Sequence, residues 1–145
     1  MIKFTAKIAS LLLMLCICSC RTHHDRSEIE AAMKQYDHLI LKLDGDSISN
    51  LYAPDGQLGD QVKGRDSIKK FLATFTNVNV LSQESLTSSI EMSGDSSLQK
   101  GSYKQEVIVD KKDTVHVKGE YITHWVWINK EKGWKIKKMM TTPVK

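Results

Sequence analysis

The chain has 145 residues and a formal net charge of +4, with 41% of its residues hydrophobic and 26% charged. This length suits one domain with a single hydrophobic core and is too short for two ordinary domains. All three cysteines (Cys16, Cys18 and Cys20) precede residue 21, so the rest of the chain has no thiol for a disulfide, a thiolate metal site or a cysteine nucleophile.

Residues 1–19 have the pattern of an export signal. Lys3 and Lys7 form a positively charged front, and an apolar run follows over residues 8–18. The run is shorter than the roughly 20 apolar residues that a membrane-spanning helix needs, and it suits the hydrophobic region of a signal peptide. Because both lysines lie in this segment, the remaining domain is closer to neutral, which argues against a nucleic-acid partner.

The segment ICSC (residues 17–20) resembles a bacterial lipobox, in which an aliphatic and then a small residue precede the cysteine that receives the lipid. We therefore expect a lipoprotein signal peptide over residues 1–19 and lipidation of Cys20 in the cell envelope. Arg21 follows this cysteine in place of the aspartate that retains some lipoproteins in the inner membrane, so the resemblance favours the outer membrane. An ordinary secretory signal with incidental cysteines is the alternative.

Residues 20–26 are expected to form a tether, followed by one folded domain over residues 27–145. Ser27 and Glu30 have the spacing of a capping box, which predicts the start of a helix. Apolar residues then recur at helical spacing along one stripe: Ile29, Met33, Tyr36, Ile40 and Leu43. Gly45 is suited to end this helix in a left-handed conformation.

Two further helices are predicted before the strands begin. A short one carries Ile48, Leu51 and Tyr52 and is stopped by Pro54. The other has apolar residues at helical spacing at four positions: Ile68, Phe71, Leu72 and Phe75.

From Val78 onward the hydrophobic period changes to two, which predicts strands. Turn-forming sequences occur at residues 93–97, 110–113 and 129–133. They divide this half of the chain into four strands, which are expected to form an antiparallel meander. Helices followed by a run of strands are typical of an α+β domain with the helices on one face of the sheet.

Along residues 115–127 the apolar side chains take odd-numbered positions, so this face is expected to meet the helices. Tyr121 and Trp125 would then point inward, with a bulge expected near Gly119 where so long a strand bends. The outer face would carry even-numbered residues, namely Ile122, His124, Val126 and Ile128.

Four motifs together resemble the SnoaL-like branch of the nuclear transport factor 2 superfamily. They are LYAPDG (51–56), GRDSIKKFL (64–72), G-x-Y-x-x-x-W (119–125) and GWKI (133–136). The resemblance covers about residues 29–140. It implies an α+β fold in which a cone-shaped, curved antiparallel sheet wraps around three N-terminal helices. It also implies a pocket at the open end of the cone and frequent dimerisation through the outer sheet face.

The resemblance implies no single activity, because the superfamily includes ketosteroid isomerase, polyketide cyclases, dehydratases and members without demonstrated activity. In many relatives the last strand places an acidic residue or a histidine in the pocket. Met139 stands at about that position here, which argues against catalysis.

A ligand pocket in the cone is expected to involve residues from the helices and the odd face, namely Tyr36, Ile40, Tyr52, Phe71, Tyr121 and Trp125. Core packing is the favoured role of Trp125. For acid–base catalysis the candidate pairs are Tyr52 with Asp55 and Tyr36 with Asp37, although solvated surface is the favoured location of both carboxylates. The histidines lack metal-ligand spacing, and no phosphate loop or dinucleotide motif occurs, so neither a metal nor a cofactor is predicted.

We therefore expect a lipid-anchored envelope protein that binds a small, largely apolar molecule without transforming it. One alternative is a small-molecule isomerase, dehydratase or hydrolase, which would need a carboxylate inside the cone. Another alternative is an interaction protein that forms a homodimer through its outer sheet face.

Overall fold

Three helices and six strands form between residues 23 and 144, which are the residues that the computed structural model describes. In chain order they are α1 (Arg26–Ile40), α2 (Gly45–Ser49), β1 (Tyr52–Leu58), β2 (Val62–Lys63), α3 (Arg65–Leu72), β3 (Val78–Ser93), β4 (Ser96–Val109), β5 (Asp113–Trp127) and β6 (Trp134–Pro143). The strands form one sheet in the order β2-β1-β6-β5-β4-β3, which confirms the α+β class. The predicted signal peptide and Cys20 lie outside the described residues.

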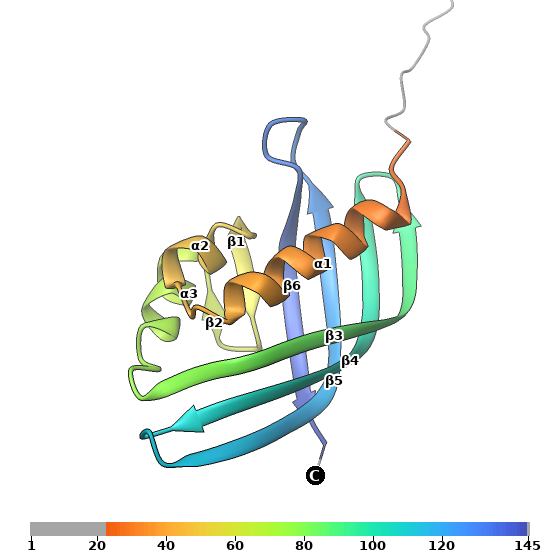
Figure 1. The fold of residues 1–145 in the computed structure, drawn as a ribbon. Helices are drawn as coiled ribbons and strands as arrows, with labels where there is room; N and C mark the ends of the chain where they lie inside the picture. Colours follow the sequence, from red (N-terminus) through yellow and green to blue (C-terminus); the bar gives the residue numbers. More distant parts are fainter. Residues whose placement is uncertain (1–22, 145) are drawn as a thin grey trace, which may run out of the picture.

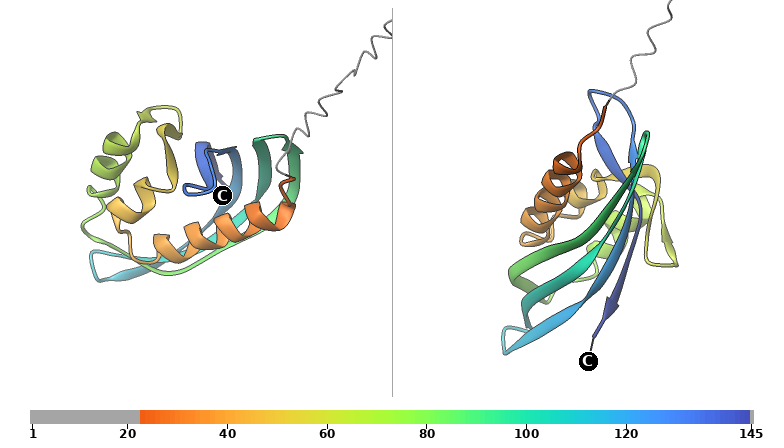
Figure 2. Two further views of the ribbon diagram at one scale, coloured as in Figure 1. Left: turned by 90° about the horizontal axis from the view of Figure 1, so that it is seen from above. Right: turned by 90° about the vertical axis from the view of Figure 1, so that its right-hand side faces the viewer.

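The sheet is strongly curved, and its long strands bend across α1 (Figure 1). Figure 2 shows that α1 lies on the concave side of the sheet, while α2 and α3 pack against each other, with α3 beside β1 and β2 at one edge of the sheet. The core lies between these layers, and its most enclosed apolar residues come from both: Ile29, Ile48, Tyr52, Ile68, Trp125 and Ile136. Within the described residues, no helix has the length and hydropathy needed to cross a membrane.

The ends of α1 differ from the sequence-based prediction. The helix begins at Arg26, and the side chain of Asp25 caps it by accepting a hydrogen bond from the backbone N–H of Ser27. At the other end, Leu43 takes the left-handed conformation, with φ of 46°. Gly45 is instead the first residue of α2, where its lack of a side chain lets it pack against the backbone of α3.

The predicted short helix exists around Ile48 but ends before Leu51, and Tyr52, which was predicted to belong to it, lies with Pro54 in a strand. Helix α2 ends at Ser49, and β1 pairs in parallel with β6, with Tyr52 opposite Ile136. The register shifts between Tyr52 and Gln57, which lets Pro54 sit in the strand without donating a ladder hydrogen bond. A partner more than eighty residues away decides this conformation, and local spacing carries no information about it.

The segment assigned as a tether has a fixed position at its C-terminal end. The side chain of His24 is only 5% exposed, and its ring packs against Trp127 and Trp134. Ordered structure therefore begins upstream of Ser27.

Two glycines of the sheet face two tyrosines of the neighbouring strand. Gly101 of β4 lies opposite Tyr121 of β5, and Tyr103 of β4 lies opposite Gly119 of β5. A Cβ atom on Gly101 would lie 2.6 Å from the hydroxyl oxygen of Tyr121, and a Cβ atom on Gly119 would lie 2.7 Å from Cε1 of Tyr103. Each tyrosine side chain therefore occupies the space that its facing glycine leaves open.

The bulge predicted near Gly119 is not there, because β4 and β5 pair in one uninterrupted register. The glycines themselves give the strands room to bend. A register shift occurs instead between His124 and Trp125, in the pairing of β5 with β6. The predicted inward face of β5 is confirmed by three buried residues: Tyr121, Thr123 and Trp125.

We expect Gly119→Ala to lower the free energy of unfolding by about 3 kcal/mol, because the added methyl group would overlap the Tyr103 ring and the carbonyl oxygen of Thr142. Gly94→Ala is the control. A Cβ atom there meets open space, and only the positive φ of 55° carries a cost, of about 1 kcal/mol. Urea denaturation measures both changes, and equal losses would contradict the steric role of the glycine–tyrosine pairs.

Candidate functional site

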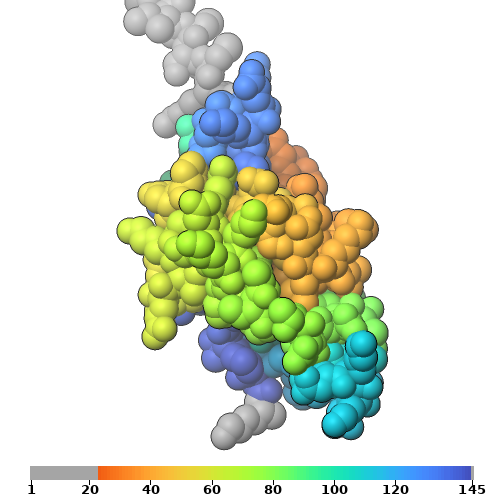
Figure 3. All heavy atoms as spheres, turned by 90° about the vertical axis from the view of Figure 1, so that its left-hand side faces the viewer, coloured from red at the N-terminus to blue at the C-terminus, as the bar shows by residue number. Residues whose placement is uncertain are grey.

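A cavity of about 260 Å³ lies between the inner face of the sheet, the C-terminal half of α1 and α3. Its apolar walls come from all of these elements: Met33, Ile40, Leu72, Val80, Val107 and Met139. Phe71 and Phe75 also line it, and each is 39% exposed, so they mark its rim. Their rings stand edge to face with centroids 5.2 Å apart. Figure 3 views the molecule from this side, with α3 and the segment after it (green) standing over the strands.

The polar part of the cavity wall is neutral. It consists of hydroxyl and amide side chains from α1 and four strands, namely Tyr36, Gln83, Ser85, Tyr103, Gln105, Tyr121 and Thr141. Every lining residue in the described part of the chain is uncharged. Apolar walls with a few hydrogen-bonding groups are typical of sites for small, largely apolar ligands, and this volume lies just below their usual range of about 300–1,000 Å³.

A chain of hydrogen bonds runs from the core to the cavity wall. Trp125 Nε1 donates to Gln99 Oε1 at 2.9 Å, and Gln99 Nε2 donates to Thr87 Oγ1 at 2.9 Å. Thr87 Oγ1 in turn lies 3.3 Å from the hydroxyl oxygen of Tyr121. Because Gln99 and Trp125 are buried, each bond avoids the cost of an unpaired polar group. This series of hydrogen bonds thereby holds the Tyr121 side chain in place on the cavity wall.

A carboxylate lies one hydrogen bond behind the cavity wall. Asp37 accepts hydrogen bonds from Ser85 Oγ at 2.7 Å, from the Ser85 backbone N–H at 3.0 Å and from Gln83 Nε2 at 3.1 Å. Ser85 and Gln83 line the cavity, and Asp37 stands outside it. Hydrogen bonds to an ionised acceptor are strong, so Asp37 fixes the orientation of these two wall residues.

The four tyrosines of the chain are held as neutral phenols. Burial raises the pKa of Tyr36 well above its ordinary value of 10.0, and the nearby Asp37 and Tyr103 add to the rise. Burial likewise raises the pKa of Tyr52, Tyr103 and Tyr121. At neutral pH the three tyrosines that line the cavity, Tyr36, Tyr103 and Tyr121, can therefore form hydrogen bonds with a ligand without bringing charge into it.

Four of the six residues predicted for a ligand pocket border this cavity: Tyr36, Ile40, Phe71 and Tyr121. The other two are placed in the core. Tyr52 is fully buried, with its hydroxyl oxygen 3.7 Å from Met139 Sδ, and Trp125 is bonded to Gln99.

Sequence reasoning did not single out Gln83, Ser85, Tyr103 or Gln105 as pocket residues. Tyr103 and Gln105 belong to an alternating run, so their shared face was readable from the sequence. The position of the cavity along that face was not readable, because α1 and α3 set it.

The two predicted Tyr–Asp pairs have different surroundings. Tyr52 lies in the core, whereas Asp55 is exposed and its carboxylate accepts a hydrogen bond from Lys137 Nζ. Tyr36 borders the cavity with Asp37 behind the wall, so only this pair is near the space that a ligand could occupy. Between residues 23 and 144, no three or more His, Cys, Asp or Glu side chains are grouped as they would be to hold a metal ion.

The outer face of β5 exposes apolar side chains. Ile122 is 41% exposed, and Ile128, just beyond the strand, is 39% exposed. The homodimer predicted through this face stays a prediction.

Comparison with known proteins finds relatives of this fold. The family described as SnoaL-like domain matches residues 21–140. A ketosteroid isomerase-like protein from Erwinia carotovora atroseptica SCRI1043 is 14% identical, with a TM-score of 0.71 over 82% of this chain and 95% of that one. A nuclear transport factor 2 (NTF2-like) superfamily protein from Salmonella enterica serovar Typhimurium LT2 is 16% identical, with a TM-score of 0.68 over 82% and 90%.

A domain of unknown function with a cystatin-like fold, from Nostoc punctiforme PCC 73102, is 15% identical, with a TM-score of 0.63 over 83% of this chain and 78% of that one. At these identities the solved structures show a shared fold alone. The comparison with curated proteins found no match.

We expect Tyr36→Phe to reduce the loss of stability at alkaline pH. Because the pKa of Tyr36 is higher in the folded chain than in the unfolded chain, its protonated phenol favours the folded state below a pH of about 10. This contribution is lost as the pH rises above that value. Between about pH 9 and pH 11 the free energy of unfolding should fall for the wild type and fall less for Tyr36→Phe. Urea denaturation at both pH values measures the difference, and identical decreases would contradict the burial of this phenol.

Proposed function

Because the chain belongs to the SnoaL-like domain family, we propose that it is a ligand-binding protein of the bacterial cell envelope, whose cavity takes up a small, largely apolar molecule without transforming it. The family is of the ligand-binding and isomerase type, so the choice between binding and catalysis depends on the side chains of the cavity.

The observation that carries this proposal is the uncharged lining of the cavity. A charged ligand would have to leave water for walls that offer no opposite charge, which is costly. An apolar ligand gains about 25 cal/mol for each Å² of apolar surface that it removes from water. The walls therefore favour a neutral molecule.

The polar wall residues suggest the shape of such a ligand. Gln83 and Ser85 of β3 both donate hydrogen bonds to Asp37 of α1, and Gln105 lies on the neighbouring strand, β4. They can exchange neutral hydrogen bonds with one or two polar groups, such as a carbonyl or a hydroxyl. Together with the volume and the aromatic rim of Phe71 and Phe75, they suit a compact ring compound with one or two such groups.

Catalysis by Tyr36 and Asp37 is the second candidate function, because this carboxylate lies directly behind the cavity wall. A general base must reach the proton that it removes. Asp37 already accepts three hydrogen bonds from Ser85 and Gln83, and its oxygens are directed to these donors instead of to the cavity. This geometry favours a supporting role for Asp37 over a catalytic one.

The envelope location rests on the sequence of residues 1–20. A lipid on Cys20 would hold the domain at a membrane surface, and Arg21 favours the outer membrane. In that location the ligand would come from outside the cytoplasm.

We expect Gln105→Glu to weaken the binding of 2-naphthol, a neutral fluorescent two-ring compound, by about tenfold. The substitution keeps the size of the side chain and places a carboxylate on the cavity wall, where an apolar ligand would have to desolvate it. Gln35→Glu, on the exposed surface of α1, makes the same chemical change away from the cavity and should leave the affinity unchanged. Fluorescence titration measures both. Equal affinities of the two variants would show that the cavity is not the binding site.

We also expect no enzymatic exchange of the α-hydrogens of 2-tetralone, a neutral ketone of similar size. Nuclear magnetic resonance in D₂O follows this exchange, with buffer alone as the reference. Exchange by the wild type that Asp37→Asn abolishes and Asp113→Asn leaves intact would establish the catalytic alternative. Asp113 is a suitable control because it is the exposed first residue of β5, next to the β4–β5 turn.

A further inference from the structure

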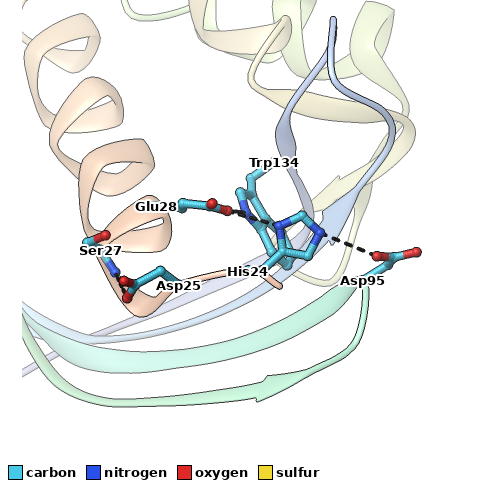
Figure 4. Close-up of polar contacts among 6 residues, drawn as sticks. All are labelled: His24, Asp25, Ser27, Glu28, Asp95 and Trp134. Carbon is cyan, nitrogen blue, oxygen red and sulfur yellow. Dashed lines mark hydrogen bonds and ion pairs between the residues drawn. The ribbon is translucent and has the colours of Figure 1, made fainter. Parts of the chain in front are cut away.

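The side chain of His24 packs against one end of the sheet. Figure 4 shows the His24 ring beside Trp134, between Glu28 and Asp95. Its Nδ1 atom lies 3.0 Å from Glu28 Oε2, and its Nε2 atom lies 3.4 Å from Asp95 Oδ1. The ring centroid is 4.4 Å from that of Trp127.

The partners of His24 are themselves tied together. Trp134 Nε1 donates to Glu28 Oε2 at 2.7 Å, and the backbone N–H of Trp127 donates to the carbonyl oxygen of Asp95 at 2.8 Å. His24 therefore joins the start of α1 to the β3–β4 turn, which contains Asp95, and to the β5–β6 turn, which lies between Trp127 and Trp134. We call this group of contacts the His24 clamp.

The His24 clamp limits the distance between the domain and the predicted lipid. Three residues separate Cys20 from His24. Four steps along an extended chain span at most about 14 Å. A lipid on Cys20 would therefore keep the β3–β4 and β5–β6 turns close to the membrane surface, whatever conformation the linking residues take.

The cavity lies toward the other end of the molecule. Helix α1 has 15 residues and leads from the clamp over about 22 Å to Ile40, on the cavity wall. Strand β5 has 15 residues and covers about 50 Å along its curved path, from the β4–β5 turn to Trp127 at the clamp. In Figure 1 the described chain starts beside the β3–β4 turn, and α3 and the β4–β5 turn lie at the opposite end.

We propose that a lipid surface lies against the β3–β4 and β5–β6 turns and that the cavity rim faces away from the membrane. This orientation rests on the lipid anchor proposed above. The β5–β6 turn carries two exposed lysines, Lys130 and Lys132, that would meet lipid phosphates, but Glu131 and Asp95 lie there as well. The short linkage between Cys20 and the His24 clamp, more than the net charge of these turns, would set the orientation of the domain on the membrane. The cavity would then take its ligand from the aqueous phase instead of from the bilayer.

The test uses the full chain, lipidated in cells and reconstituted into vesicles of phosphatidylethanolamine and phosphatidylglycerol that contain a lipid with a nitroxide on its headgroup. A fluorescent label is attached to one introduced thiol, at Lys132→Cys in the β5–β6 turn or at Lys112→Cys in the β4–β5 turn. Both lysines are exposed.

All native cysteines precede residue 21, so the domain has no competing thiol. We expect the nitroxide to quench the label at position 132 several-fold more strongly than the label at position 112.

Two further variants test the cause of the difference. Inserting about twelve Gly and Ser residues between Arg21 and Thr22 lengthens the linkage without touching the folded domain, and it should bring the two labels to similar quenching. His24→Ala removes the ring contacts but keeps the Trp134–Glu28 hydrogen bond, so it should reduce the quenching difference less than the insertion does, with circular dichroism used to check that the domain remains folded.

Membrane fractionation of the wild type and of Cys20→Ser separates the two proposals. A wild-type chain that is recovered in the soluble fraction overturns the lipid anchor and the orientation with it. A membrane-bound wild type in which both labels are quenched equally, or in which the label at position 112 is quenched more, overturns the orientation alone. A quenching difference that survives the insertion shows that the short linkage does not cause it.

Discussion

The reciprocal glycine–tyrosine pairs of β4 and β5 are the constraint on which the cavity depends. Gly101 and Gly119 carry no side chain on the inner face, so Tyr121 and Tyr103 can lie across the facing strand and the sheet can bend over α1. Both tyrosines then reach the cavity wall. A side chain at either glycine would push a tyrosine away from the backbone, and the curvature and the lining would change together.

Two polar side chains behind the cavity wall, Gln99 and Asp37, have their partners within the protein, and this determines what the cavity offers to a ligand. Gln99 is shared between Trp125 and Thr87, and Asp37 is shared between Ser85 and Gln83. The strongest acceptor near the site is thus used to orient two neutral wall residues. A binding cavity needs such fixed, uncharged groups, whereas general base catalysis needs a carboxylate directed at the ligand.

The two ends of the domain carry different structural features. The His24 clamp secures the chain to the turns at one end of the sheet, and the cavity opens near α3 toward the other. With the proposed lipid on Cys20, the long strands between these ends would hold the proposed ligand site away from the membrane surface. The same strands carry the curvature that forms the cavity, so one sheet provides both properties.

The sequence by itself determined the α+β class, the helical stripe of α1 and the inward face of β5, because these depend on the spacing of apolar residues within one segment. Only the tertiary structure decided the strand conformation of Tyr52, the place of Trp125 behind Gln99 and the burial of His24. Their partners are dozens of residues distant along the chain. Periodicity shows which face of an element is buried. Whether a buried side chain fills the core or borders a cavity depends on the volume that distant segments place opposite it.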